Sequence, residues 1–312
     1  MLFRMKKISV VVPVYNNEGS LRTVYAETVK TICDFSKEFT YEIIFINDAS
    51  RDSSLDILLD IKSKDTSVIV IDFSRNFGQM AGILAGWDIA SGDAIINMSA
   101  DLQDPISQIT EMLKHWEQGN EIVINYRLTR SDSFSNVLSS KLAYMLLKQS
   151  LPSLPNGGFD YTLIDQKVLE AIKQIKEKNR FFQGDILWVG FTIKYLPYHR
   201  QERIHGKSGY NFKKRLGNFL VAYLNISYTP IRFMSLLGIL TALLGFLYSL
   251  TILYSYFVHH TPFKGWAPIM MVLLIIGGIL MMMLGVIGEY IWRIYDEVKY
   301  RPNYIIKKKY VD

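Results

Sequence analysis

Two long apolar runs near the C-terminal end constrain the fold of this chain more than any other feature. Ile231 to Val258 carries one charge, Arg232 near its start, and Ala267 to Gly288 carries none. Each run reaches the ~20 residues that a helix needs to cross a bilayer. A buried core helix is the alternative, but two such runs in succession favour membrane helices. The connector HHTPFKGW is too short for a domain, so the runs predict a transmembrane hairpin.

Basic residues flank the predicted hairpin on both sides, whereas its connector carries a single lysine. They are Lys213, Lys214, Arg215 and Arg232 before and within the start of the first run, and Arg293, Lys299, Arg301, Lys307, Lys308 and Lys309 after the second. Because cytoplasmic segments of membrane proteins are enriched in lysine and arginine, we expect both termini to be cytoplasmic.

The first part of the chain alternates between short Val- and Ile-rich runs and helical patterns. The runs predict strands over residues 8–15, 41–48, 67–74, 94–99 and 121–127, with helices over 18–36, 53–64, 78–90 and 105–118. Nearly continuous apolar strands that are separated by helices are typical of a parallel sheet covered on both faces. The expected fold class is therefore α/β, with a Rossmann-like parallel sheet.

Carboxylates follow directly after two of these strands. Asp48 ends one strand, and Ser99 and Asp101 end another. Parallel sheets bind ligands beyond the carboxyl ends of their strands. Mg²⁺ commonly takes one or two carboxylates and completes its coordination with water and substrate phosphates, so Asp101 is predicted to hold a metal beside a nucleotide diphosphate. Asp104, immediately before Pro105, fits either the same site or the cap of a helix that begins at Pro105.

Several other function classes find no support. The net charge of +6 is compatible with nucleic acid or an anionic membrane surface, but no nucleic-acid-binding motif is present. Neither a dinucleotide-binding G-x-G-x-x-G after the first strand nor a P-loop occurs. Gly78, Gly82 and Gly86 form a small helix face that favours close packing on the sheet, and Gly78 is also open to a ligand contact. The single cysteine, Cys33, excludes an intramolecular disulfide.

Six segments together carry a resemblance to a known family: VVPVYNNE, YEIIFINDAS, SRNFGQMAGILAG, SADLQDP, NRFFQGDILWVGF and GEYIWRIYDEVKYRP. In order and spacing they resemble the polyisoprenyl-phosphate glycosyltransferases, which are family 2 glycosyltransferases with a GT-A fold and relatives of dolichol-phosphate mannose synthase and bactoprenol glucosyltransferase. The resemblance covers about residues 8 to 304. It implies metal-dependent, inverting transfer of a hexose from a nucleotide-diphosphate sugar to a polyprenyl monophosphate such as undecaprenyl phosphate.

The resemblance also implies a place in the cell and partners. The expected location is the cytoplasmic face of a bacterial inner membrane, in a multi-pass protein that modifies cell-envelope glycans and forms a homo-tetramer. UDP-glucose and UDP-N-acetylglucosamine are the expected donors, and Mg²⁺ or Mn²⁺ the expected cofactor. The predicted parts are a GT-A domain over residues 1–228, the hairpin over 229–290 and a basic cytoplasmic tail over 291–312. Basic amphipathic patterns near 134–150 and 210–227 suit interfacial helices or packing on the domain.

Individual site residues follow from the matching motifs. Asp101 would hold the metal, Asp160 would lie beside the donor sugar, and Arg127 would face the acceptor phosphate; these three are the predicted catalytic residues. The residues implied for the nucleotide and donor are Pro13, Tyr15, Asn17, Asp48, Gly78, Ser99, Gln103, Arg180 and Trp188. Those implied for the acceptor phosphate are Arg127, Ser140 and Lys207.

The chain departs from the family pattern at the metal motif. Ser99 stands where the family usually has aspartate, so one negative charge is missing beside Asp101. Further departures are Asn17, Asn47, Thr162 and Gly209. The serine leaves two alternatives open: weaker metal binding in an active enzyme, or a membrane-tethered protein that binds nucleotide sugars without catalysis.

The chemistry of the implied reaction places its own demands on the site. A phosphate monoester is already anionic near pH 7, its second pKa being about 6, so it can attack an anomeric carbon without a general base. Catalysis then requires a stabilised leaving group, an aligned nucleophile and screened repulsion between two anions. Asp101 with its metal would serve the leaving diphosphate. Arg127 and Lys207 would serve the acceptor.

A processive polysaccharide synthase is the remaining alternative. Such an enzyme shares the broad superfamily, but this chain contains no Gln-x-x-Arg-Trp motif, and two spans are few for a polymer channel.

Overall fold

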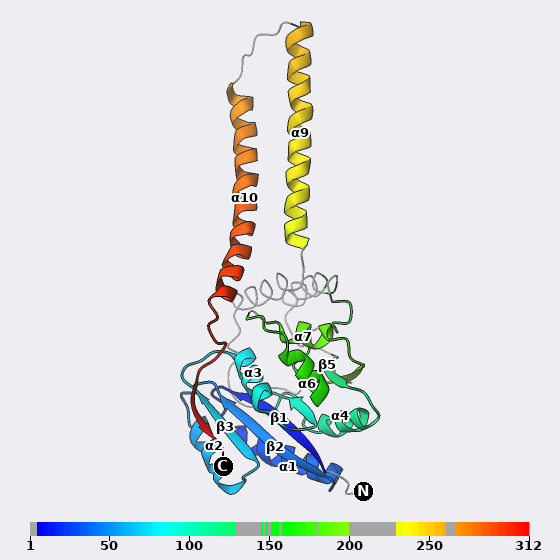
Figure 1. Ribbon diagram of the computed structural model, residues 1–312, viewed down its shortest axis with the longest axis vertical. Coiled ribbons are helices and arrows are strands. Elements are labelled where there is room, and N and C mark those ends of the chain that lie inside the picture. Colours follow the sequence, from blue (N-terminus) through cyan, green and yellow to red (C-terminus); the bar gives the residue numbers. More distant parts are fainter. Residues whose placement is uncertain are drawn as a thin grey trace. The chain divides into compact units, whose positions relative to one another are not determined.

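The computed structural model describes residues 5–128, 145, 148, 151–155, 158–178, 180–199, 229–259 and 266–311 (Figure 1). The chain forms two compact units. One comprises Met1–Asn225 together with Pro302–Asp312, and the other comprises Ile226–Arg301. The predicted segments near 134–150 and 210–227 lie outside the described residues, except for residues 145 and 148.

An eight-stranded mixed sheet forms the centre of the first unit, in the order β7-β5-β6-β4-β1-β2-β3-β8. Strands β1, β2, β3 and β4 pair in parallel, as do β5 and β7, whereas β6 and β8 are antiparallel to their neighbours. The strands are β1 (Lys6–Val14), β2 (Phe39–Asn47), β3 (Val68–Phe73), β4 (Ala94–Asn97), β5 (Ile122–Arg127), β6 (Tyr161–Asp165), β7 (Ile193–Tyr198) and β8 (Ile306–Tyr310).

Helices cover both faces of the sheet, because alternate residues of the central strand β1 are apolar on each side. Ile8, Val10 and Val12 belong to the core formed with α1, α2 and α4. Val11 faces α3 on the other side. The helices of this unit are α1 (Leu21–Phe35), α2 (Ser54–Lys64), α3 (Gln79–Ile89), α4 (Gln108–Glu117), α6 (Gln166–Lys173) and α7 (Phe182–Trp188).

The small residues of α3 allow it to lie directly on the sheet, as the spacing of glycines predicts. A Cβ atom at Gly86 would come within 2.2 Å of Val11 Cγ1, and one at Gly82 within 3.1 Å of Pro13 Cβ. Gly78 differs, because an added Cβ would meet nothing within 4 Å. Its φ of +94° lies in the left-handed region, where a residue with a side chain is strained.

The structure confirms the α/β fold class and the first five strands, but the sheet is not wholly parallel. Strand β6 runs antiparallel between β4 and β5, and β7 adds a further strand beyond β5. The period of apolar residues indicates that a segment is a strand, yet it carries no information about direction.

The basic C-terminal segment is not a separate tail. Residues Ile306–Tyr310 form β8, which pairs antiparallel with β3 at the edge of the sheet, and Lys309 lies opposite Ile71. Most of the strand is exposed. The sequence does not predict this strand because its three consecutive lysines lack the apolar pattern of a core strand, whereas lysine is common on edge strands.

The second unit consists of α9 (Thr229–His259) and α10 (Trp266–Val298), which lie side by side and antiparallel (Figure 1). Both helices are long and apolar enough to cross a membrane: Ile231–Tyr248 and Ile275–Val298 each have a mean hydropathy of 1.8 and are not buried inside the protein. Helix α10 continues ten residues beyond the predicted end at Gly288. The extension carries charged residues, including Arg293, which pairs with Glu289 one turn earlier.

Candidate active site

The polar residues predicted from strand ends gather along one edge of the sheet. The carboxyl ends of β1, β2, β4, β5 and β7 meet there, because these strands run in the same direction. Strand β6 is antiparallel, so its amino end, preceded by Asp160, reaches the same edge. Arg127 and Tyr198 are register partners at the ends of β5 and β7. The topology thus brings the segments holding Asp48, Asp101 and Asp160 to a common edge.

A single hydroxyl joins two carboxylates after β4. Ser99 Oγ lies 2.9 Å from Asp101 Oδ1 and 2.6 Å from Asp104 Oδ2. A serine hydroxyl has one proton to donate, so it can serve one of these carboxylates fully at a time. The backbone N–H of Gln103 also donates to Asp101 Oδ1, at 3.3 Å. The Asp101 carboxylate is therefore oriented by its own loop.

The hydrogen bonds continue from Asp104 to the end of the sheet. The Tyr198 hydroxyl donates to Asp104 Oδ1 at 2.6 Å, and Arg127 Nε donates to the Tyr198 oxygen at 3.2 Å. Arg127 Nη2 then donates to Asp160 Oδ2 at 3.1 Å. We call the connected residues Asp101, Ser99, Asp104, Tyr198, Arg127 and Asp160 the polar chain. It joins the predicted metal ligand to the residue predicted to lie beside the sugar.

The protonation states of the polar chain follow from burial and neighbouring charges. Burial alone would lower the pKa of Arg127, but the nearby Asp160 raises it, and so does Tyr198, so the pKa stays above its ordinary value. Burial raises the pKa of Tyr198, and the charge of Asp104 raises it further. Arg127 is therefore cationic and Tyr198 neutral near pH 7.

Asp104 belongs to the polar chain and is not a helix cap. Helix α4 begins at Gln108 with Ser107 at its N-cap position, three residues after Asp104. The Asp104 residue is only 2% exposed. Its two carboxylate oxygens instead accept hydrogen bonds from Ser99 and Tyr198, which compensate for the cost of burying a charge.

Asp48, which is predicted to contact the nucleotide, also orders the loop before α3. Its carboxylate accepts hydrogen bonds from the N–H groups of Phe77, at 2.6 Å, and Gly78, at 2.9 Å. Burial raises the pKa of Asp48, and these two N–H groups offset part of that rise. Near Asp48, the exposed Tyr15 follows β1, and its N–H donates to Asn17 Oδ1 at 3.0 Å.

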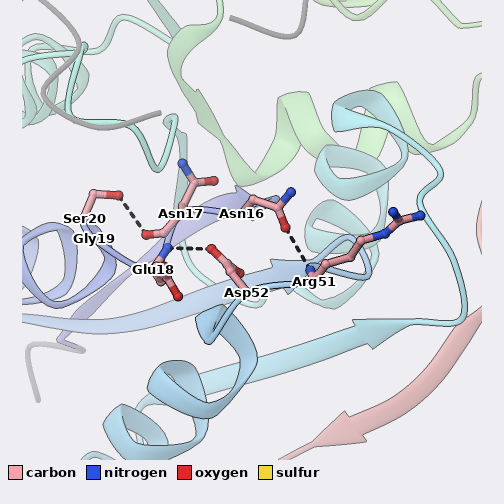
Figure 2. Close-up of a pocket in the computed structure, with 7 residues that line it drawn as sticks. All are labelled: Asn16, Asn17, Glu18, Gly19, Ser20, Arg51 and Asp52. Carbon is pink, nitrogen blue, oxygen red and sulfur yellow. Dashed lines mark hydrogen bonds between the residues drawn. The ribbon is translucent and has the colours of Figure 1, made fainter. Parts of the chain in front are cut away.

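An open cavity of about 520 Å³ lies at the ends of β1 and β2 (Figure 2). Hydrogen bonds from Arg51 N to Asn16 Oδ1 and from Glu18 N to Asp52 Oδ2 tie its two loops together. Its lining residues are Asn16, Asn17, Glu18, Gly19, Ser20, Arg51 and Asp52. Of the predicted donor residues only Asn17 lines it, so this cavity by itself is not the predicted donor pocket.

Arg180 and Trp188, both predicted to close the donor pocket, occupy different environments. The Arg180 side chain is 8% exposed and donates to Asp185 Oδ2 at 2.8 Å and to the Ile172 carbonyl at 3.2 Å. Burial raises the pKa of Asp185 to about 6, although Arg180 opposes this rise. Trp188 is 75% exposed at the end of α7. Arg180 therefore secures α7, and Trp188 is the one that is open to a ligand.

The donor atoms near Asp101 fit a hard divalent cation only in part. Within the part of the chain that the structure describes, no group of three or more His, Cys, Asp or Glu side chains is placed to hold a metal ion. One or two carboxylates that are completed by substrate phosphates are a common arrangement for Mg²⁺, and Asp101 fits it. The predicted acceptor residues Ser140 and Lys207 lie outside the described residues.

Comparisons with known proteins give two family matches and several similar relatives. Residues 9–173 match the family described as glycosyl transferase family 2, and residues 229–294 match the family described as the GtrB C-terminal hairpin. The chain is 40% identical over 304 residues to the uncharacterized glycosyltransferase YkcC of Bacillus subtilis (strain 168). The alignment covers 97% of this chain and 94% of the relative. The chain is also 37% identical over 308 residues to the bactoprenol glucosyl transferase of Shigella phage SfII. This alignment covers 97% of this chain and 98% of the relative.

Among solved structures, the chain is similar to glucosyl-3-phosphoglycerate synthase from Mycobacterium tuberculosis in complex with Mn²⁺, UDP-glucose and phosphoglyceric acid. The TM-score is 0.47 and the identity 16%, over 70% of this chain and 79% of the other.

Proposed function

Since this chain belongs to the glycosyl transferase family 2 and carries a GtrB C-terminal hairpin, we propose that it transfers glucose from UDP-glucose to a polyprenyl monophosphate. UDP-N-acetylglucosamine is the alternative donor. The observation that carries the proposal is the polar chain, which joins a carboxylate suited to a cation to a partly buried arginine suited to a phosphate. Relatives named as bactoprenol glucosyl transferases, similar over nearly their whole length, support the choice of sugar and lipid.

The donor lies, in this proposal, along the ends of β1, β2 and β4. Mg²⁺ or Mn²⁺ held by Asp101 supplies charge neutralisation for the diphosphate when it is bound. The backbone N–H of Gln103 helps to keep Asp101 in position, and Asp101 shares the single Ser99 proton with Asp104. The residues proposed to contact the nucleotide, diphosphate and sugar are Pro13, Tyr15, Asn17, Asp48, Gly78, Ser99, Gln103 and Trp188.

The acceptor phosphate lies at the other end of the polar chain. Arg127 is cationic, and among the described residues its contacts to Tyr198 and Asp160 use two of its five N–H donors. We assign its other donors to the acceptor phosphate, together with Ser140 and Lys207. Asp160, 43% exposed and paired with Arg127, is positioned to accept hydrogen bonds from sugar hydroxyls. In this proposal the two substrates lie next to each other, one at each member of the ion pair.

The reaction needs no general base. An oxygen of the acceptor phosphate attacks the anomeric carbon, the bond from that carbon to the diphosphate breaks, and the nucleoside diphosphate leaves with the electron pair. No proton has to move, and a single displacement inverts the anomeric centre. Asp101 acts on the leaving group and Arg127 on the nucleophile, which are the two sites of charge change.

The rate of transfer should rise with pH through about 6 and stay flat above it. The second pKa of a phosphate monoester is about 6, so more of the acceptor is fully ionised as the pH rises through that value. Asp160→Asn should lower the rate, because it weakens the hydrogen bonds to the sugar hydroxyls. It should leave the shape of the curve of rate against pH unchanged. Initial rates between pH 4.5 and pH 8.5 measure both.

Asp185 is one protein group that needs a control here, because its pKa of about 6 lies in the same range. Asp185→Asn should retain the acid limb of the curve, which is the rise in rate through about pH 6. A phosphonate acceptor holds its second proton more tightly than a phosphate, so it should move this limb to higher pH. Loss of the limb in Asp160→Asn would instead identify Asp160 as a general base and contradict the mechanism.

We also propose that the active site and both termini face the cytoplasm, where nucleotide sugars are available. The exposed Cys33 on α1 is the only cysteine of the chain and serves as the internal probe. In intact spheroplasts a membrane-impermeant maleimide should not label the wild-type protein. It should label Thr261→Cys, placed in the connector of a Cys33→Ser background. Labelling of wild-type Cys33 before lysis would contradict this orientation.

The experiment that tests the function is a screen of radiolabelled nucleotide sugars with undecaprenyl phosphate and the purified protein. We expect label to enter the lipid fraction from UDP-glucose more than from UDP-N-acetylglucosamine. Binding of nucleotide sugar without transfer from any donor would favour the non-catalytic alternative, for which Ser99 is the one supporting feature.

A further inference from the structure

Two residues at the centre of the polar chain have no assigned role in transfer. Asp104 is 2% exposed and Tyr198 3% exposed, so neither presents a surface to a substrate. They connect the two halves of the site nonetheless. Asp104 lies in the loop after β4, next to Asp101, and Tyr198 ends β7, opposite Arg127 on β5.

The hydrogen bonds of this pair have a defined direction. Arg127 Nε has only a proton to offer, so it donates to the Tyr198 oxygen. Tyr198 stays neutral, so its own proton goes to Asp104 Oδ1. The other oxygen, Asp104 Oδ2, lies 2.6 Å from Ser99 Oγ and is the nearer of the two carboxylate oxygens that share its single proton. Each end of the Asp104 carboxylate therefore holds one group: a hydroxyl beside the predicted metal ligand, and the hydroxyl that orients the arginine.

We infer that Tyr198 and Asp104 are positioning residues that hold Arg127 and the Ser99 hydroxyl in fixed relative orientations, and so align the acceptor phosphate with the donor sugar. This inference rests on the proposed function. Transfer between two bound substrates depends steeply on their alignment, and a misplacement of about 1 Å can cost ~100-fold in rate. A side chain that turns Arg127 by a small angle acts on that alignment without touching either substrate.

Packing of the ring and bonding by the hydroxyl can be separated at Tyr198. The ring packs edge-on against Tyr161, with ring centres 6.2 Å apart and planes at 89°. Tyr198→Phe retains this contact and removes only the hydroxyl. The variant therefore tests orientation of Arg127 while most of the buried apolar contact stays in place.

Tyr198→Phe should raise the KM for the lipid phosphate at least about 10-fold and lower kcat. The dissociation constant for UDP-glucose with Mg²⁺, measured by calorimetry without acceptor, should stay within about twofold. The hydroxyl makes two charge-assisted hydrogen bonds, one from Arg127 Nε and one to Asp104 Oδ1, and loss of the first is worth about a tenfold change in use of the acceptor. Asp104→Asn, which keeps the shape of the side chain but not its charge, should shift the acceptor KM in the same direction.

Tyr195→Phe is the matched control on the same strand. The Tyr195 hydroxyl donates to the Ser153 carbonyl, and its ring packs against Tyr126, outside the polar chain. This variant also loses one tyrosine hydroxyl and should leave both constants within twofold. Thermal unfolding of all variants separates a folding defect from a kinetic one.

A double variant decides whether Tyr198 acts through Arg127. In an Arg127→Ala background, Tyr198→Phe should have no further effect on the acceptor KM, because the residue that it orients is gone. A purely structural role would lower activity equally in both backgrounds and would overturn the inference. So would an unchanged acceptor KM in Tyr198→Phe when the wild type is active. A wild-type protein that transfers no sugar would instead overturn the proposed function, and this inference with it.

Discussion

Replacing Asp101 with asparagine should lower the rate of sugar transfer by at least ~100-fold. The substitution keeps the shape of the side chain and removes its charge. A fall of this size is typical when an active site loses one group that stabilises charge in the transition state. The structure adds a reason to expect a clean result. The side chain is oriented by Ser99 and by the backbone of Gln103, and an asparagine oxygen can accept both bonds. Charge is therefore the main property that changes.

Initial rates over a series of Mg²⁺ and Mn²⁺ concentrations measure this effect. Asp56→Asn is the matched control, because Asp56 is an exposed carboxylate in the first turn of α2, away from the sheet edge. It should leave the rate within twofold. An Asp101→Asn enzyme that keeps the wild-type rate at limiting metal would show that Asp101 does not hold the cation.

Arg127→Ala should lower kcat/KM for the lipid phosphate by about 100-fold. Two charge-assisted hydrogen bonds to a phosphate are worth roughly 1.5 kcal/mol each, and every 1.4 kcal/mol is tenfold. The Arg127 side chain is 15% exposed, so its contacts are poorly replaced by water. Removing it also leaves Asp160 without its cation beside an incoming anion. Affinity for UDP-glucose should change little, because the proposed site for its diphosphate is at Asp101, at the other end of the polar chain.

Arg22→Ala controls for loss of an arginine–aspartate pair in general. Arg22 Nη1 lies 2.7 Å from Asp60 Oδ2, but the Arg22 side chain is 60% exposed, and such surface pairs contribute little. The control should transfer sugar at the wild-type rate. If Arg127→Ala weakens binding of UDP-glucose instead of use of the lipid, the acceptor phosphate has been assigned to the wrong end of the polar chain.

Five strands of the sheet could be predicted from sequence because they are apolar on both faces, whereas the short buried strand β6, with the sequence YTLID, was not predicted. Strands β1 to β5 read as Val- and Ile-rich runs for this reason, and the helices between them followed from their spacing. Strand β7, with the pattern IKYLPY, is only half-buried, and β8, with IKKKY, is exposed. Neither has the continuous apolar signal of a central strand, so both were missed, and with them the partner of Arg127.

The sequence predicts candidate site residues, which stay a hypothesis, but it does not predict the hydrogen bonds that connect them. Asp101, Arg127 and Asp160 were found from motifs, and the polar chain links all three. From sequence, Asp104 fits a helix cap as well as a site residue, because it precedes a proline. Its burial and its hydrogen bond with Tyr198 identify it as part of the polar chain. Tyr198 lies 94 residues further along the chain. A contact at that separation depends on sheet order, which local sequence patterns do not encode.

The measurement that tests the central claim most directly is the identity of the released nucleotide and of the lipid product in a single reaction. Purified protein, UDP-glucose and undecaprenyl phosphate should give UDP and a glucosyl lipid that retains one phosphate, in equal amounts, as read by ³¹P NMR and mass spectrometry. Asp101→Asn should give neither in the same time. Release of UMP with a lipid diphosphate would mean that a sugar phosphate is transferred, and would contradict the proposed attack of a lipid phosphate on the anomeric carbon.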